Sequence, residues 1–378
     1  MTIERQLSQT ITDRLDHVTP PQPDLDAVVR RGRRRQRRRH IGVALASTVV
    51  LGAGLATAAG MGAFESGSVG PRPERLDAVG QLDFTDGLRA YMSPDADGKI
   101  WLGGRSFPVG DLSQIDTDAT ATPYGMVFFD RAQRAYLMRE DGTSVPLAPA
   151  PDAPRRAFHP TSKSDSRLPL VAWSEPAADR VIIRLYDLAA GAAMDSIEIP
   201  CAGAACSKVF VDAVDQGLVF VRTAEGTSVW DPNSTGDARW TTLSGPGTQV
   251  ADARNKRILH TGRAPTPAAG SPIDSSWSFT EGAIDAQLSF DGRYVLDWST
   301  RLEPTSPAHD PVELDISAGD WPFVTFDTDG SVLVAVPDAP LQAMTATVYD
   351  CEIPSGVCTE LSDVKTESGD PVFVGNDM

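Results

Sequence analysis

Several residue types are scarce in this chain, and each scarcity leaves a class of function without support. Only five lysines occur among 378 residues, so the 34 basic residues are almost all arginines. Of the five histidines, only His159, His260 and His309 lie beyond the apolar residues 41–64. The sequence lacks H-E-x-x-H, G-x-S-x-G, G-x-x-x-x-G-K-[ST] and G-x-G-x-x-G motifs. The sequence therefore gives no support for a zinc peptidase, a serine hydrolase, a P-loop nucleotide-binding protein or a dinucleotide-binding protein. We expect no enzyme activity, no catalytic residue and no cofactor.

Cysteine is scarce as well, and its spacing argues for disulfides. Cys201 and Cys206 form one local pair, and Cys351 and Cys358 form another. Cys-x₄-Cys and Cys-x₆-Cys, far apart in the chain, do not have the spacing of a zinc site. Local pairs oxidise and persist outside the reducing cytosol. We therefore expect two disulfides, Cys201–Cys206 and Cys351–Cys358.

Two acidic stretches resemble the start of a calcium loop. They are Asp95-Ala96-Asp97-Gly98 and Asp327-Thr328-Asp329-Gly330. Neither continues to the bidentate glutamate that closes such a loop. Aspartate and glycine also supply the backbone angles of tight hairpin turns. Both stretches are therefore expected to be turns, and no metal site is predicted.

Charge divides the chain into two parts. Residues 1–40 hold ten arginines against five acidic residues, a net charge of +5, which leaves −22 for the remainder of a chain whose total is −17. Residues 41–64 carry no charge and are long enough to span a bilayer as one helix. Because arginines stay on the cytoplasmic side, we expect a single-pass protein of the cell membrane with a cytoplasmic N-terminus and an extracellular C-terminal domain.

A cleaved signal peptide is the alternative interpretation of residues 41–64. Ala56-Thr57-Ala58 has the small-x-small form of a cleavage site. However, 40 residues precede the apolar stretch, whereas a signal peptide has a short basic region, so an uncleaved anchor is favoured. Arginine clusters also bind nucleic acid. Beside an apolar span they more simply set topology and contact the lipid bilayer, and the acidic remainder argues against nucleic acid.

The N-terminal tail suggests a possible partner. Residues 1–29 are too few to bury a core, so they form either a leader or a segment that binds a cytoplasmic regulator. The stretch from Asp24 to Arg35, running into an alanine-rich span, resembles the front end of single-pass envelope proteins of actinobacteria, some of them membrane-bound anti-sigma factors. Zinc-type anti-sigma domains contain cysteine, whereas residues 1–40 contain none.

The remaining chain is predicted to be all-β. Residues 65–81 are expected to form a flexible tether, and residues 82–378 contain short apolar runs separated by Asp, Gly, Asn and Pro turns. A pattern of aspartate, polar turn and apolar run begins seven times, at steps of 35 to 47 residues. The starts are Asp95, Asp130, Asp165, Asp212, Asp252, Asp291 and Asp327. A unit near 40 residues with about four strands is typical of a propeller blade.

A second repeated feature supports this interpretation. Tyr186-Asp187, Trp230-Asp231 and Tyr349-Asp350 each end a predicted strand and precede a glycine. The repeat resembles that of WD40-like and TolB-like β-propellers, which implies a ring of about seven blades, although a pair of β-sandwiches is an alternative. The seven tryptophans, about one per unit, are expected to pack between blades. Val372-Phe373-Val374 and the run from Leu88 to Met92 are expected to complete one shared blade.

Two hypotheses for function follow. In the first, the propeller is a non-enzymatic binding or scaffold module at the cell surface, and its ligand is a protein, peptide or glycan bound through loops. In the second, it is the sensor domain of a transmembrane, anti-sigma-like regulator, and residues 1–29 bind a transcription factor in the cytoplasm. The tail distinguishes the two hypotheses.

Overall fold

The computed structural model describes most of the chain beyond residue 86. The described residues are 87–93, 99–108, 119–130, 132–149, 151, 160–268, 270–297, 299–316, 322–337, 346–365 and 372–373. Contacts divide the chain into two units, Met1–Val69 and Gly70–Met378, and every described residue belongs to the second. The expected tail, span and tether lie outside the described residues. None of the helices in the described part of the chain has the length and apolar character needed to cross a membrane.

The described residues form seven small sheets. The first contains β1 (Tyr91–Ser93), β2 (Lys99–Leu102), β3 (Arg105–Pro108) and β27 (Val372–Phe373). The second contains β4 (Thr120–Thr122), β5 (Gly125–Phe129), β6 (Ala135–Met138) and β7 (Ser144–Pro146). The third contains β8 (Ser162–Ser164), β9 (Leu170–Pro176), β10 (Arg180–Asp187) and β11 (Ala192–Pro200), and the fourth contains β12 (Phe210–Asp215), β13 (Leu218–Thr223), β14 (Gly226–Trp230) and β15 (Trp240–Thr242).

The last three sheets complete the series, and two short 3₁₀ helices lie at the ends of strands. The fifth sheet contains β16 (Gln249–Arg254), β17 (Arg257–Thr261) and β18 (Ser278–Glu281). The sixth contains β19 (Gln287–Leu288), β20 (Tyr294–Leu296), β21 (Arg301–Pro304) and β22 (Val312–Glu313), and the seventh contains β23 (Phe323–Phe326), β24 (Val332–Pro337), β25 (Ala346–Cys351) and β26 (Cys358–Lys365). The helices are η1 (Gly203–Lys208) and η2 (Gly236–Arg239).

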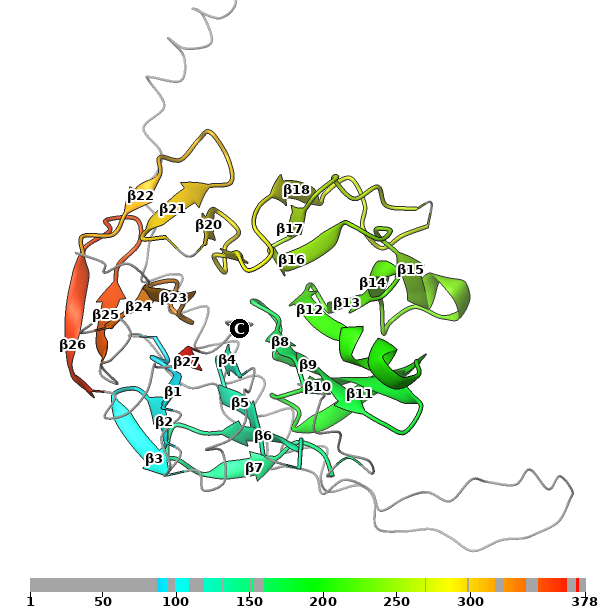
Figure 1. The fold of residues 1–378 in the computed structure, drawn as a ribbon, viewed down its shortest axis with the longest axis horizontal. Coiled ribbons are helices and arrows are strands. Elements are labelled where there is room, and N and C mark those ends of the chain that lie inside the picture. The colour runs from blue at the N-terminus through cyan, green and yellow to red at the C-terminus, as the bar shows by residue number, and fades with distance from the viewer. Residues whose placement is uncertain are drawn as a thin grey trace, which may run out of the picture. The chain divides into compact units, whose positions relative to one another are not determined.

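The sheets are arranged as a β-propeller. In Figure 1 they follow one another in chain order around a common centre, and the first strands of the sheets, such as β4, β8, β12 and β23, lie nearest to it. This arrangement confirms the predicted all-β propeller and excludes the sandwich alternative. The number of sheets matches the number of units counted in the sequence.

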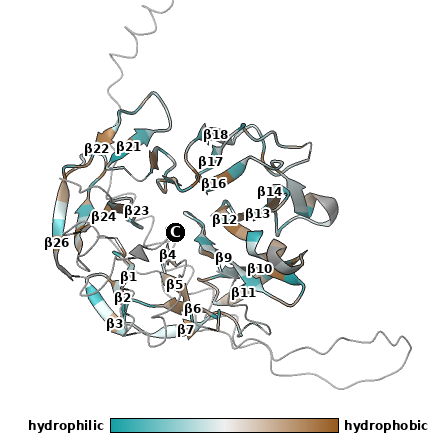
Figure 2. Cartoon of the chain, viewed as in Figure 1, coloured by the Kyte–Doolittle hydropathy of each residue, from teal (hydrophilic) through white to brown (hydrophobic). Residues whose placement is uncertain are grey.

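Alternation of side chains explains why the strands stack in this way. In β10, Val181, Ile183 and Leu185 are buried, and they share a core cluster with Val211 and Val219 of the next sheet. A sheet of four short strands cannot cover its own faces, so each packs against its neighbours. Figure 2 shows the same gradient, because the inner strands β5 and β23 are brown, whereas the outer strand β3 is largely white to teal.

The ends of the chain's folded part meet in the first sheet. β27 pairs antiparallel with β1, with Tyr91 opposite Phe373 and Met92 opposite Val372, and thereby occupies an edge of the sheet formed by β1, β2 and β3. The expectation that these two segments complete a shared blade is confirmed. A shared sheet leaves fewer unpaired strand edges and ties the last part of the chain to the first.

Buried aspartates link neighbouring sheets near the ring centre. Asp165 Oδ2 accepts a hydrogen bond of 2.9 Å from Gly217 N in the next sheet. Asp215 accepts bonds of 3.0 and 2.6 Å from the backbone N–H groups of Asn255 and Lys256. Asp165 follows β8 and is one of the repeat starts read from the sequence, whereas Asp215 is the last residue of β12, three residues after the repeat start Asp212. The repeat therefore marks links between sheets as well as turns.

One sheet departs from the expected unit of about four strands. The fifth sheet has three strands in the described residues, and its last strand, β18, runs parallel to β17. A parallel connection needs a long crossover, which residues 262–277 provide. Pro265, Pro267 and Pro272 lie in this segment and cannot donate ladder hydrogen bonds. The sequence carried this signal, but the uniform spacing of units masked it.

Candidate functional site

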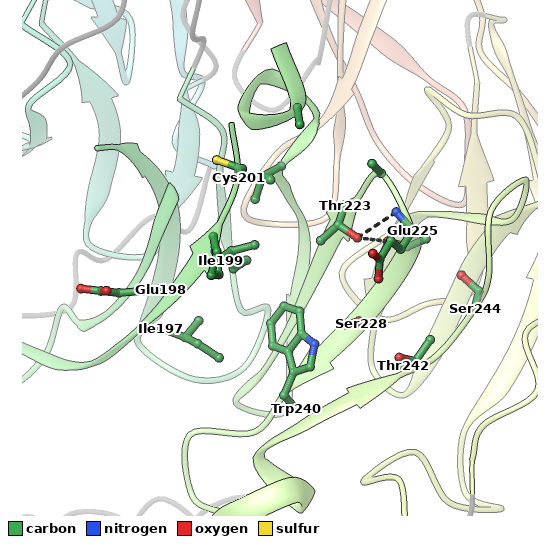
Figure 3. Close-up of a pocket in the computed structure, with 15 residues that line it drawn as sticks. Ile197, Glu198, Ile199, Cys201, Thr223, Glu225, Ser228, Trp240, Thr242 and Ser244 are labelled. Carbon is green, nitrogen blue, oxygen red and sulfur yellow. Dashed lines mark hydrogen bonds between the residues drawn. The ribbon is translucent and has the colours of Figure 1, made fainter. Parts of the chain in front are cut away.

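A groove lies between the third and fourth sheets, at the outer strands. Its cavity volume is about 490 Å³. One wall is formed by residues 197–200 at the end of β11 and by Cys201, which follows the strand. The other wall is formed by residues 223–226 and by Ser228, Trp240, Thr242 and Ser244, and Ala205 and Val209 complete the lining. We refer to this cavity as the groove (Figure 3).

Alternation along β11 gives the groove its apolar wall. Ile197 and Ile199 are half-buried and pack against the core cluster shared by the third and fourth sheets, as does Trp240. Trp230, which pairs with Trp240 across β14 and β15, is fully buried. Trp240 is only half-buried, and its ring lies between the isoleucines and the opposite wall (Figure 3). The groove therefore offers an aromatic surface that solvent reaches.

A tight turn places an acidic side chain on the other wall. Thr223 Oγ1 donates to Gly226 O at 3.2 Å and accepts from Glu225 N at 3.2 Å, which fixes the turn between β13 and β14. Gly226 has a φ of 125°, and a Cβ there would lie 2.1 Å from Ser244 O, so only glycine fits. Glu225 is exposed, and its carboxylate points down from this turn toward Trp240 (Figure 3).

A disulfide closes one end of the groove. Cys201 and Cys206 are bonded, with Cα atoms 5.1 Å apart, and Cys206 belongs to η1, which connects to β12. Cys206 is buried in the same core cluster as Val209. Cross-linking so small a loop removes freedom mainly from the unfolded chain and contributes about 2 kcal/mol. The predicted pairing is present, and it holds the wall of the groove in place.

We refer to the boundary between the seventh and first sheets as the seam. A second cavity lies there. Its volume is about 470 Å³, and its charged lining consists of Arg89, Asp329, Asp350 and Glu352. Arg89 Nη2 and Asp350 Oδ2 form an ion pair at 2.9 Å. The second predicted disulfide, Cys351–Cys358, lies beside it with a Cα–Cα distance of 4.0 Å.

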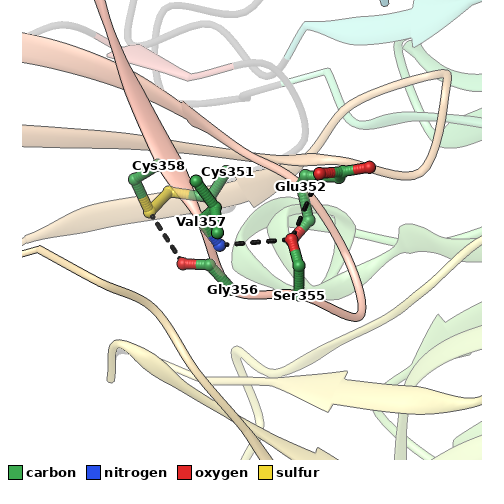
Figure 4. Close-up of a disulfide and its surroundings, with 6 residues drawn as sticks. All are labelled: Cys351, Glu352, Ser355, Gly356, Val357 and Cys358. Carbon is green, nitrogen blue, oxygen red and sulfur yellow. Dashed lines mark hydrogen bonds between the residues drawn. A yellow bond between two sulfur atoms is a disulfide. The ribbon is translucent and has the colours of Figure 1, made fainter.

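The loop inside this disulfide is held by its own hydrogen bonds (Figure 4). Ser355 Oγ accepts from Val357 N at 3.3 Å and contacts the Glu352 carboxylate at 3.2 Å. Gly356 N donates to Glu352 O at 2.8 Å. The polar groups of the seam therefore bond mostly to one another.

Asp327 is a buried carboxylate with a raised pKa at the seam. Its carboxylate is buried and accepts hydrogen bonds from Leu88 N at 2.9 Å and Arg89 N at 2.8 Å. Burial raises the pKa of Asp327 to about 6, and burial also raises the pKa of Asp215. Both carboxylates bind backbone of the next sheet. The backbone hydrogen bonds lower the two pKa values, so the upward shifts come from burial of the carboxylates where neighbouring sheets meet.

The acidic stretch that starts at Asp327 forms the turn expected from the sequence. Gly330 N donates to Asp327 O at 2.9 Å, and Asp327 N donates to Ser331 O at 2.9 Å, which closes the hairpin between β23 and β24. Among the described residues, no group of three or more His, Cys, Asp and Glu side chains is placed to hold a metal ion. Asp95 and Asp97 lie outside the described residues.

Sequence reasoning located both disulfides but missed the groove. Most described tryptophans pack between sheets as expected, and Trp173, Trp230 and Trp277 are buried. Trp240 also packs against a core cluster between sheets, but it is only half-buried. No local signal marked it, because Trp230 and Trp240 lie opposite one another on adjacent strands and both pack against the same core cluster.

Comparison with known proteins identifies similar structures but no family. No family model matches the chain, and no curated protein matches it. TolB from Acinetobacter baumannii is similar at 11% identity with a TM-score of 0.37, over 75% of this chain and 64% of that one. A protein from Lactobacillus plantarum is similar at 14% identity with a TM-score of 0.39, over 78% of this chain and 96% of that one.

A third solved structure, apo AztD from Citrobacter koseri, is similar at 12% identity with a TM-score of 0.34, over 76% of this chain and 79% of that one. The chain spans less than two thirds of the TolB structure that it matches. These values are too low to transfer a function. The description of this chain as a propeller rests on its own strand pairing.

Proposed function

We propose that the chain is a membrane-anchored, extracytoplasmic β-propeller that acts as a non-enzymatic binding or scaffold module at the cell surface. The observation that carries this proposal is the groove. It combines an accessible indole ring, an exposed carboxylate and several hydroxyls on a scaffold of paired strands. Rigid elements position such groups more accurately than loops do.

The lining of the groove favours binding over catalysis. Thr223, Ser228, Thr242 and Ser244 supply hydroxyls, but the lining includes no histidine or lysine that could activate them. Ser244 Oγ already donates to Thr248 O at 3.0 Å. Thr223 Oγ1 is likewise bonded within its own turn, which leaves the hydroxyls of Ser228 and Thr242 to orient a ligand.

The proposed location rests on sequence features. The arginines before residues 41–64 favour a cytoplasmic N-terminus. The acidic remainder suits a soluble exterior domain, and two disulfides suit an oxidising compartment. Protease added to intact cells expressing the full chain should digest the propeller while residues 1–40 stay protected. Full protection of the propeller would contradict the proposed topology.

Binding is tested on the full chain in intact cells with arrays of peptides and glycans. We expect at least one ligand class to bind the wild type and to be lost on Trp240→Ala, with Trp173→Phe as a control for a tryptophan outside the groove. Absence of binding to every class, or binding that Trp240→Ala does not change, would contradict the proposal. Deleting residues 1–29 separates the alternative, because only a sensor would then lose a transcriptional response while ligand binding persists.

A further inference from the structure

We propose that the groove takes an extended peptide segment of a partner protein, which adds as a strand beside β11 and places a lysine or arginine side chain between Trp240 and Glu225. This inference rests on the proposed binding function and names its ligand. Three features support the inference. They are the direction of the backbone N–H and C=O groups of β11, the part of its free edge that makes no hydrogen bond within the chain, and the charge of the residues that line the groove.

The backbone of β11 has a free edge on the side away from β10. In an antiparallel ladder, successive residues direct their N–H and C=O groups alternately to the partner strand and away from it. Cys201 N donates to Asp179 O at 3.0 Å, which fixes the residues directed inward as 201, 199 and 197. The groups of Ser196, Glu198 and Pro200 are therefore directed outward.

The protein itself closes one part of this edge. Ser196 N donates to the carboxylate of Asp195 at 2.8 Å, and Ser196 O accepts from Arg239 Nη2 at 3.3 Å. These contacts agree with the outward direction derived from the ladder. A strand edge that is closed by side chains does not recruit another strand.

The edge is open at Glu198, which lies in the groove. Within the described residues, no hydrogen bond to the backbone N–H or C=O of Glu198 is found on the outward side. The Glu198 side chain points away from the groove (Figure 3) and pairs with Arg180 at 3.1 Å, so the residue lines the groove through its backbone. A peptide strand would find one donor and one acceptor there, and an acceptor at Pro200.

The lining is complementary to a cationic side chain. Its charged residues are Glu198 and Glu225, both acidic, and Glu225 makes no ion pair among the described residues. A lysine or arginine that enters from a strand beside β11 meets the indole face of Trp240 and the Glu225 carboxylate. Cation–π attraction and a charge-assisted hydrogen bond then act on the same group.

These features favour a peptide over a sugar. A sugar would use the indole and the hydroxyls, but it has no use for a strand edge with backbone donors and acceptors two residues apart. The edge from residue 197 to residue 201 matches about five residues of extended peptide at roughly 3.3 Å each. Side chains of such a peptide alternate, so every second one faces the groove.

The experiment measures binding of short peptides to the full chain by fluorescence polarisation in detergent solution. The probe is a labelled Thr-Val-Lys-Val-Thr peptide with blocked ends, and the matched peptides carry arginine, norleucine or glutamate at the centre. We expect the lysine and arginine peptides to bind about tenfold more tightly than the norleucine peptide, and the glutamate peptide to bind most weakly.

Variants of the chain test each contact. Glu225→Gln should weaken the lysine peptide about fivefold to tenfold and leave the norleucine peptide unchanged. Glu281→Gln, an exposed glutamate at the end of β18, is the control for the loss of charge. Glu198→Pro removes the outward N–H without touching the pairing with β10, and Glu198→Gln removes only the ion pair with Arg180. We expect Glu198→Pro to bind the lysine peptide more weakly than the wild type does, and Glu198→Gln to bind it as tightly as the wild type.

Each other outcome overturns the inference in a distinguishable way. Equal affinity for the lysine and norleucine peptides would show that the groove has no site for a cationic side chain. An equal loss of peptide affinity in Glu198→Pro and Glu198→Gln would contradict the addition of the peptide as a strand. Glycans that bind in a manner sensitive to Trp240→Ala, with no peptide bound, would overturn the peptide but keep the proposed binding function. If neither class binds, both proposals fail.

Discussion

The groove and the seam have the same construction but use their charges differently. Each lies between neighbouring sheets beside a short disulfide loop, and their volumes are about 490 and 470 Å³. At the seam, Arg89 pairs with Asp350, and Asp327 accepts from two backbone N–H groups of the other end of the chain. In the groove, Glu225 has no such partner among the described residues.

This difference separates stability from recognition. A buried carboxylate that is fully bonded within the chain contributes to the fold, and losing one partner leaves the other desolvated and unbonded. An exposed carboxylate beside an accessible indole contributes little to the fold and remains free to bind a ligand. Changes at the seam should therefore alter unfolding, and changes in the groove should alter binding.

Removal of β27 should have the largest effect. Deleting residues 370–378 takes away Val372 and Phe373 and leaves an edge of the first sheet unpaired. Because every sheet packs on its neighbours, we expect the melting transition of the whole propeller to fall and lose cooperativity in calorimetry. Deleting residues 375–378 keeps β27 and is the control. An unchanged melting temperature in the longer deletion would show that the shared sheet does not hold the ring.

Asp327→Asn should be the most damaging single substitution at the seam. Leu88 N and Arg89 N donate to different oxygens of Asp327, so the amide keeps one acceptor but turns its NH₂ group toward the other donor, and we expect a loss of about 2 kcal/mol in the free energy of unfolding. Asp350→Asn weakens a partly exposed ion pair and should cost about 0–1 kcal/mol. Urea titration measures both. Equal losses would mean that the backbone bonds of Asp327 are unimportant.

Removal of either disulfide should lower stability by a similar amount, but only one removal should weaken peptide binding. Replacing both cysteines of either pair with serine should lower the free energy of unfolding by about 2 kcal/mol. Only Cys201→Ser with Cys206→Ser should also weaken the lysine peptide, because this pair fixes the end of the groove. A binding defect of the same size in the Cys351 and Cys358 variant would erase the distinction between the two regions.

The pH dependence should carry the signature of Asp327. Its pKa is about 6 when folded and near 4 when unfolded, so the folded state binds its proton more tightly. Its contribution to stability is fully present below about pH 4 and is lost as the pH rises through 6. The wild type should therefore exceed Asp327→Asn by about 2 kcal/mol more at pH 4 than at pH 7. A constant difference in urea titrations would contradict the raised pKa.

Features set by local pattern could be predicted from the sequence. The aspartate repeat gave the number of sheets because each unit repeats the same turn and strand chemistry. The spacing of Cys201 and Cys206 fixed their pairing because a small loop brings the two side chains together. The apolar runs at both ends predicted β27 with β1 because an unpaired edge needs a partner.

Features set by the packing of one sheet on another could not be predicted. Nothing in the composition distinguishes Trp240 from the buried Trp230, since only the position in the sheet exposes one of them. Glu225 is one of many acidic residues, and its place above the groove depends on the close approach of Gly226 to Ser244. The parallel strand β18 was missed for a related reason, because pairing direction depends on the path of residues 262–277.

The most direct measurement is a double-mutant cycle between Glu225 and the central residue of the peptide. The four affinities are those of wild type and Glu225→Gln for the lysine and norleucine peptides. If the cation meets this carboxylate in the groove, the two changes are not additive, and we predict a coupling energy of about 1 kcal/mol that decreases with salt. Additive changes, with no coupling at low salt, would contradict the assignment of the groove as the recognition site.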